Sequence, residues 1–238
     1  MAEKKQHTIV SASENKPVTH QIKPAAPVGN AAGLRVGAVV LWVCALAFEV
    51  LALLVILGKL TLSFLPTLWQ LIGFLALDLI CVSIGSLLWK KANRIKPASK
   101  ADKLRFWLWN NMGLIVCVVA FVPFVILLLS NKDLDKKTKT IATVVALIAL
   151  LIGGAVSYDY NPVSLEEQQS AIENVTTDVY WAPFGKVYHT HEDCQALNRT
   201  DELTVGTVEE AIAANRTRLC AFCAREDGIT GVTTDDAE

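Results

Sequence analysis

Four long apolar runs restrict the fold of this chain more than any other feature of its sequence. They lie at about residues 34–57, 65–89, 106–129 and 141–158. Helices of roughly 20 apolar residues are long enough to cross a hydrocarbon core about 30 Å thick. A soluble fold built from four such runs would lack the polar surface that it needs to cover itself. The sequence therefore predicts an all-α membrane bundle of four transmembrane helices.

Charge divides the chain into two parts of opposite sign. Residues 1–156 carry 17 Lys/Arg and 7 Asp/Glu, whereas residues 157–238 carry 5 Lys/Arg and 16 Asp/Glu. A basic apolar part followed by an acidic polar part indicates a membrane region joined to a soluble domain. The acidic part would repel a phosphate backbone, so we expect no nucleic-acid partner.

Basic residues at the ends of the apolar runs predict the orientation. The N-terminal tail and the loop between the second and third runs carry 12 Lys/Arg, against 5 in the other two loops. With four crossings, the C-terminus would share the side of the N-terminal tail. An excess of Lys and Arg marks the cytoplasmic side of a membrane. We therefore expect a multi-pass protein of the cell membrane with both termini in the cytoplasm.

Two acidic residues, Glu49 and Asp78, interrupt the first and second runs. A charged side chain at the centre of a bilayer costs roughly 2.5–3.5 kcal/mol, so such residues face the bundle interior or a partner. One interpretation is a neutral acid that hydrogen-bonds across helices, with Gln70, Asn110 and Asn111 as available partners. The other is an ion- or proton-linked site in a small transporter or channel-like component.

The acidic part contains a set of metal-ligating residue types. Cys220 and Cys223 form a Cys-x-x-Cys pair, and His189 and Cys194 lie about 25 residues upstream, with His191 as a rival ligand. Three cysteines and one histidine are typical of a closed, tetrahedral structural zinc site. A disulfide bond is the alternative stabilising cross-link, but it would leave one of the three cysteines unpaired. A region of about 50 residues buries little apolar surface, so a bound Zn²⁺ would supply much of its folding free energy.

Local patterns around these ligands predict a small α+β domain. Residues 179–189 are typical of a β-hairpin, because β-branched and aromatic residues flank a Pro and a Gly. Thr207 and Glu210 form the S/T-x-x-E capping box of a short helix that ends near Asn215. A further short helix is expected over residues 164–174.

The pattern GKVYHTHEDCQAL…GTVEEAIAANRTRLCAFC resembles a known family. It is similar to the small Cys/His zinc module at the C-termini of many bacterial membrane and surface proteins, which are mostly uncharacterised. More distantly, it is similar to the metal-binding module of the Ada DNA-repair protein. The resemblance covers residues 179–226, implies no particular activity, and does not extend to the membrane half. It implies four metal ligands: His189, Cys194, Cys220 and Cys223.

A catalytic zinc needs an open coordination position and a general base beside it. Glu192 lies next to the ligands, so a membrane-bound zinc hydrolase is a rival hypothesis. The zinc deaminase signature is His-x-Glu followed by Pro-Cys-x-x-Cys. Here Thr190 and Leu219 stand where the signature has His and Pro. We therefore expect no enzymatic activity.

Together these patterns predict an integral membrane protein that carries a structural-zinc interaction or sensing module. Its partners would be the lipid bilayer and a protein that binds the zinc module. The expected segments are a disordered N-terminal tail (1–33), a four-helix transmembrane domain (34–158), a linker (159–178), a zinc-binding module (179–226) and a disordered acidic tail (227–238).

Overall fold

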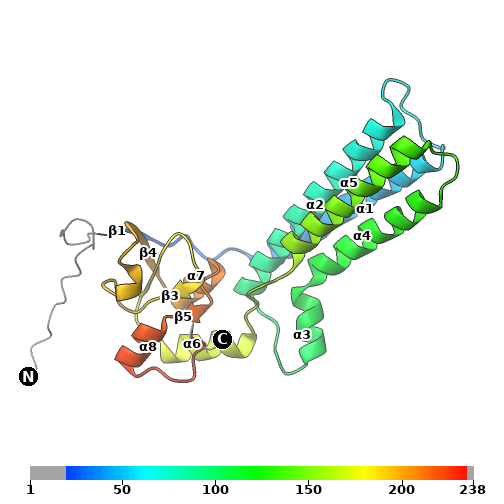
Figure 1. The fold of residues 1–238 in the computed structure, drawn as a ribbon. Helices are drawn as coiled ribbons and strands as arrows, with labels where there is room; N and C mark the ends of the chain where they lie inside the picture. Colours follow the sequence, from blue (N-terminus) through cyan, green and yellow to red (C-terminus); the bar gives the residue numbers. More distant parts are fainter. Residues whose placement is uncertain (1–19, 235–238) are drawn as a thin grey trace, which may run out of the picture. The chain divides into compact units, whose positions relative to one another are not determined.

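A computed structural model describes residues 20–234 of the chain, which divide into two compact units. One unit contains residues 30–162 and is built from helices (Figure 1). The other joins residues 20–29 to residues 163–234 and contains all the strands. We describe each unit separately.

Four long helices run alongside one another in the helical unit (Figure 1). Each is long enough and apolar enough to cross a membrane, which confirms the prediction of four such helices. The helices are α1 (Ala31–Ile56), α2 (Thr67–Ile95), α4 (Met112–Ser130) and α5 (Lys136–Ser157).

On α1, small residues face the inside of the bundle and larger apolar residues face its outside. On α1, Ala38, Ala45 and Ala52 follow one another at intervals of seven residues and are fully buried. Val36 and Val43 of the same helix are 64% and 61% exposed. Small residues let helices approach closely in a bilayer, and a large exposed apolar surface marks a face that lipid or another apolar partner covers. Both features suit a membrane protein.

The third apolar run differs from the prediction, because it is not one helix that begins at Phe106. A short helix, α3 (Lys103–Asn110), ends at a break, and α4 starts after it at an angle (Figure 1). The side-chain amide groups of Asn110 and Asn111 each donate to a carbonyl one turn back in α3. Asn side chains compete with the backbone in this way and are therefore poor residues inside a helix. Hydropathy alone cannot detect such a break.

Two small sheets form the other unit. The first has the order β1-β4-β2, in which β1 is parallel and β2 antiparallel to β4. In the second, β3 and β5 run parallel. The strands are β1 (Gln21–Pro24), β2 (Val179–Trp181), β3 (Val187–Tyr188), β4 (Glu202–Gly206) and β5 (Arg218–Leu219).

Short helices surround these sheets, and two of them start with the capping boxes typical of helix N-termini. Thr207 accepts from the backbone N–H of Glu210, whose carboxylate accepts from the N–H of Thr207 in return, as predicted. Asn215, with a φ of 70°, follows the end of this helix. The helices are α6 (Leu165–Asn174), a 3-10 turn (Gln195–Leu197), α7 (Val208–Ala213) and α8 (Ala221–Asp227).

The expected hairpin at residues 179–189 exists only as a single antiparallel bridge between Tyr180 and His189. β2 takes β4 as its ladder partner, and β3 takes β5. β2 pairs over three residues with β4, and β3 pairs over two residues with β5. Each of these ladders is longer than the single bridge that joins β2 to His189. Alternation of residue types identifies a strand but does not specify its partner.

The bounds of the strand-bearing unit also differ from the expected segments. Residues 20–29 were expected to be disordered, but β1 pairs with β4 along its whole length. The expected linker at 159–178 contains α6, whose Ala171 is buried in the core. In the C-terminal tail expected at 227–238, the carbonyl of Thr233 accepts the N–H of Leu219 at 2.9 Å, so part of this tail is attached to the unit. The expected tail residues 1–19 and 235–238 lie outside the described part of the chain.

This unit has an apolar core of its own, which the size argument did not anticipate. Trp181, Tyr188, Leu203 and Ile212 are among its buried members, and three cysteines of the predicted metal site pack within it. Because residues 20–29 and 163–178 add to the module, it buries more apolar surface than residues 179–226 alone would.

Candidate metal centre

The Cys-x-x-Cys pair lies at the start of α8. Cys220 is the N-cap residue of this helix, and its carbonyl accepts the backbone N–H of Ala224 at 2.9 Å. Cys223 lies within the first turn, so both sulfur atoms come from one tight bend of the chain. Both residues are 1% exposed.

The histidine is held by backbone pairing on two sides. His189 exchanges two backbone hydrogen bonds with Tyr180 of β2, at 2.7 and 2.8 Å. On the other side, the N–H of Cys220 donates to the carbonyl of Tyr188 at 2.9 Å. These backbone hydrogen bonds therefore bring His189 next to the cysteine pair, although about 30 residues separate them in the sequence.

The ligand atoms of His189, Cys194, Cys220 and Cys223 all lie within 4.8 Å of one another. The sulfur atoms of Cys194 and Cys220 are 3.8 Å apart, and Cys223 Sγ is 3.8 Å from His189 Nδ1. Sulfur atoms at tetrahedral corners, each about 2.3 Å from a central Zn²⁺, are about 3.8 Å apart. Disulfide sulfur atoms are about 2.0 Å apart. The four side chains are therefore spaced to share one ion, and they could hold a metal.

The charges of the cluster also suit a cation. Hydrogen bonds from the thiols of Cys194 and Cys220 hold the pKa of Cys223 well below its usual range and outweigh burial. Burial lowers the pKa of His189, but hydrogen bonds to Cys220 and Cys223 outweigh it and raise that pKa to about 9. Hydrogen bonds to Cys220 and Cys223 raise the pKa of Cys194 above its usual range, so the cluster holds a thiolate at Cys223 together with the positive charge of His189. A metal ion bound by thiolates supplies that positive charge in place of protons.

His191, the rival ligand, points to a different partner. Its Nε2 atom lies 2.7 Å from Asp227 Oδ1, and the other oxygen of Asp227 accepts from the hydroxyl of Thr190 at 2.5 Å. Burial lowers the pKa of His191, but the bond to Asp227 outweighs this effect and raises it. His189 is therefore the histidine of the cluster, a choice that the spacing in the sequence left open.

Glu192, the residue weighed as a general base, is exposed, whereas the four clustered side chains are buried. A catalytic zinc site keeps a position that is open to water, and a structural site is closed. The arrangement of the cluster is that of a closed site.

The two acidic residues of the apolar runs lie inside the helical unit. Glu49 and Asp78 are 7% and 1% exposed. None of the partners considered from the sequence reaches them. The amide group of Gln70 bonds to carbonyls of the loop before α2, while Asn110 and Asn111 lie at the α3–α4 break.

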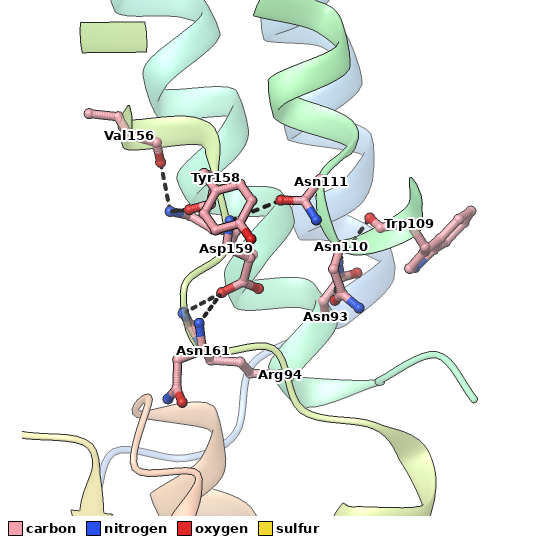
Figure 2. Close-up of polar contacts among 10 residues, drawn as sticks. Asn93, Arg94, Trp109, Asn110, Asn111, Val156, Tyr158, Asp159 and Asn161 are labelled. Carbon is pink, nitrogen blue, oxygen red and sulfur yellow. Dashed lines mark hydrogen bonds and ion pairs between the residues drawn. The ribbon is translucent and has the colours of Figure 1, made fainter. Parts of the chain in front are cut away.

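A polar layer that sequence reasoning missed closes one end of the helical bundle. Figure 2 shows the carboxylate of Asp159 with Arg94, whose Nη2 lies 3.7 Å from it, and the side chain of Asn111, which accepts the N–H of Asp159 at 3.2 Å. Asn93 donates to Asn110 at 3.3 Å. The signal in the sequence was present, since these polar residues cluster at the ends of apolar runs.

Comparison with known proteins adds no relative: no family model, curated protein or solved structure matches this chain.

Proposed function

We propose that this chain is a four-span integral membrane protein whose strand-bearing unit is a structural-zinc module for interaction or sensing, with no enzymatic activity. The observation that carries the proposal is the set of four buried ligands, Cys3His, at tetrahedral spacing. Thiolate and imidazole ligands in a closed tetrahedral set favour Zn²⁺ over hard cations such as Mg²⁺.

The pairing of β1 with β4 supports the proposed topology. β1 precedes the first of the four long helices and β4 follows the last, yet the two strands belong to one sheet. Both ends of the helical unit must then lie on the same side of the membrane, as an even number of crossings requires. The excess of Lys and Arg on that side favours the cytoplasm.

A zinc ion with four protein ligands stabilises the fold of the surface around it and has no free coordination position for a substrate. Phe184, in the loop between β2 and β3, is 89% exposed. Phe, like Tyr and Trp, is enriched at the core of protein–protein interfaces relative to the rest of the surface. The module thus offers an apolar contact for a protein partner.

Metal analysis of the full-length protein in detergent tests the zinc proposal. We expect about one Zn²⁺ per chain, and a cobalt-substituted sample with the absorption bands of a tetrahedral thiolate site. Cys220→Ser and His189→Ala should each lose most of the metal, because each removes one of four ligands. Cys44→Ser is the matched control, since it removes an exposed thiol of α1 outside the cluster.

Zinc retained in full by Cys220→Ser, or lost equally from Cys44→Ser, would contradict the proposal. The hydrolase hypothesis has a separate test, because Glu192→Ala should leave metal content and folding unchanged. Any hydrolysis that disappears in Glu192→Ala while zinc remains bound would favour that rival.

A second candidate function rests on Asp78. Both of its carboxylate oxygens are buried without a hydrogen-bond partner among residues 20–234, and Glu49 lies nearby. Because an ionised carboxylate in this position is costly, the pair would carry a proton or a cation. This arrangement supports a small proton- or ion-linked transporter.

Carbodiimide labelling of the protein in lipid vesicles tests this second candidate, since the reagent modifies protonated carboxyl groups in apolar surroundings. We expect label at Asp78 that falls as pH rises or as Na⁺ is added, and none in Asp78→Asn. Proton or Na⁺ flux into the vesicles should disappear in the same variant. If Asp78 is labelled but the protein carries no proton or Na⁺ flux, the transporter hypothesis is wrong and the acid has a structural role.

A further inference from the structure

A cleft of about 340 Å³ opens at the end of the helical unit where α1 begins and α2 ends. Three parts of the chain form its walls: the start of α1, the loop from α2 to α3, and α3 itself. This volume is near the lower limit for small-ligand sites, which are about 300–1,000 Å³. Arg35, Lys96, Asp102, Arg105 and Trp109 are among the residues that line it.

The charge of the lining is strongly positive. Arg35, Lys96 and Arg105 contribute three cations, and Asp102 is the single acid of the lining. The carboxylate of Asp102 is already engaged, because its Oδ1 accepts the backbone N–H of Arg105 at 3.1 Å and caps α3. The cleft therefore offers a field that attracts an anion.

Arg35 is fixed in place before any ligand arrives. Its guanidinium carbon lies 5.8 Å from the ring centroid of Trp89 and 5.3 Å from that of Trp109. Both rings therefore hold it by cation–π contact. Its Nη2 donates to the carbonyl of Lys96 at 2.8 Å. Its Nε is buried and has no hydrogen-bond partner in the described residues. A preorganised guanidinium binds phosphate oxygens with little further loss of entropy.

The neighbouring surface places the cleft at the level of lipid headgroups. α3 leads into the apolar helix α4 and exposes Leu104 and Trp107, which are 68% and 46% exposed. A short helix with exposed apolar and aromatic residues next to basic residues is typical of the membrane interface. The cations of the cleft then lie where phosphate groups of the same leaflet lie.

We propose that this cleft binds the phosphate group of an anionic phospholipid, with Arg35, Lys96 and Arg105 as its ligands. Basic pockets between membrane helices on the cytoplasmic side are suited to such headgroups. The inference rests on the membrane placement proposed above, but its test uses detergent-solubilised protein and does not depend on the zinc module or on orientation. Free inorganic phosphate shares the same chemistry, so the experiment must separate the two sources.

Native mass spectrometry of the full-length protein in a neutral detergent supplies the test, with short-chain phosphatidylglycerol, phosphatidylcholine and inorganic phosphate as probes. We expect phosphatidylglycerol to bind at least tenfold more tightly than phosphatidylcholine, and inorganic phosphate to compete only weakly. The double variant Lys96→Gln/Arg105→Gln should weaken phosphatidylglycerol binding at least tenfold. These two side chains are chosen because Arg35 also contacts the tryptophans.

The matched control is Lys91→Gln/Lys103→Gln, which removes two positive charges from the same end of the unit but none from the lining. It should bind phosphatidylglycerol within about twofold of the unaltered protein, and circular dichroism should show that both variants keep their helices. Equal loss in the two double variants would overturn the proposal, because attraction would then be general. Equal binding of the two lipids, or inorganic phosphate that displaces the lipid at equimolar concentration, would also overturn it.

Discussion

Glycine residues, which have no side chain, set the spacing between the long helices at single points. A Cβ atom on Gly113 of α4 would overlap Ser86 of α2, which itself hydrogen-bonds to Ser157 of α5 at 2.8 Å. Three helices therefore meet at this point through small residues. In a bilayer, helix association depends on such close packing and on hydrogen bonds between helices, because lipid is as apolar as the side chains.

We expect Gly113→Ala to destabilise the helical unit by about 1–3 kcal/mol, since an added methyl group forces α2 and α4 apart. The measurement is thermal unfolding in detergent, followed by circular dichroism. Gly73→Ala is the control, because a Cβ there meets nothing within 4 Å. If both variants unfold at the same temperature, Gly113 is not at a close helix contact.

Tyr188, at the centre of the other unit, is fully buried, and burial raises the pKa of its hydroxyl. This hydroxyl has no hydrogen-bond partner in residues 20–234. We expect Tyr188→Phe to keep or increase stability, by up to about 1–3 kcal/mol, because a buried unpaired polar group is removed. Tyr188→Leu should lose stability through the cavity it leaves.

Chemical denaturation of the metal-loaded protein, followed by tryptophan fluorescence, provides the measurement for Tyr188. Zinc content should not change in either variant, since neither alters a ligand. A clear loss of stability in Tyr188→Phe would mean that the hydroxyl has a partner, and the expectation would then be wrong.

At the level of elements, β1 is the least expected part of the fold. It lies at the edge of its sheet and pairs with β4 in parallel register, from Gln21 with Glu202 to Pro24 with Val205. The backbone N–H of Gln21 donates to Asp201 at 2.8 Å, and that of Ala25 donates to Val205 at 2.8 Å. Alternate residues along this edge therefore donate their backbone N–H groups to β4, and the N–H of Ile22 points away from β4.

We expect Gln21→Pro to weaken the attachment of β1 by about 1 kcal/mol, because it removes one of these donors. Hydrogen exchange of the β4 amides should then become faster. Ile22→Pro is the matched control, since a proline is tolerated where an edge strand faces solvent. Equal effects of the two substitutions would show that β1 does not pair in this register.

For the whole molecule, the pairing of β1 with β4 in one sheet predicts that the segments before α1 and after α5 lie on the same side of the membrane. Single cysteines introduced at exposed positions of the N-terminal segment and of α8 should react alike with a membrane-impermeant reagent, in a background without exposed native cysteines. We expect protection in intact cells and labelling after permeabilisation, because both segments should lie in the cytoplasm. Opposite accessibility of the two positions would exclude the pairing of β1 with β4 in the membrane-embedded protein.

Much of the architecture followed from local properties of the chain. The four apolar helices and the capping box of Thr207 and Glu210 were predicted because hydropathy and capping depend on residues within a few turns. The cysteine pair was predicted as a metal site because Cys220 and Cys223 can reach one ion from a single bend. The helix break at Asn111 was missed, since the competing side-chain hydrogen bonds leave no trace in hydropathy.

The sequence by itself thus determined which segments are helical and apolar and which residue types could bind a metal. The tertiary structure placed His189 rather than His191 with the cysteines, as the family resemblance implied. It alone decided that β1 belongs to the distant sheet and that Arg35 meets Lys96. Each of these outcomes depends on contacts between residues far apart in the chain. Such contacts form only when backbone pairing and burial bring remote segments together, and no local pattern specifies which partners will meet.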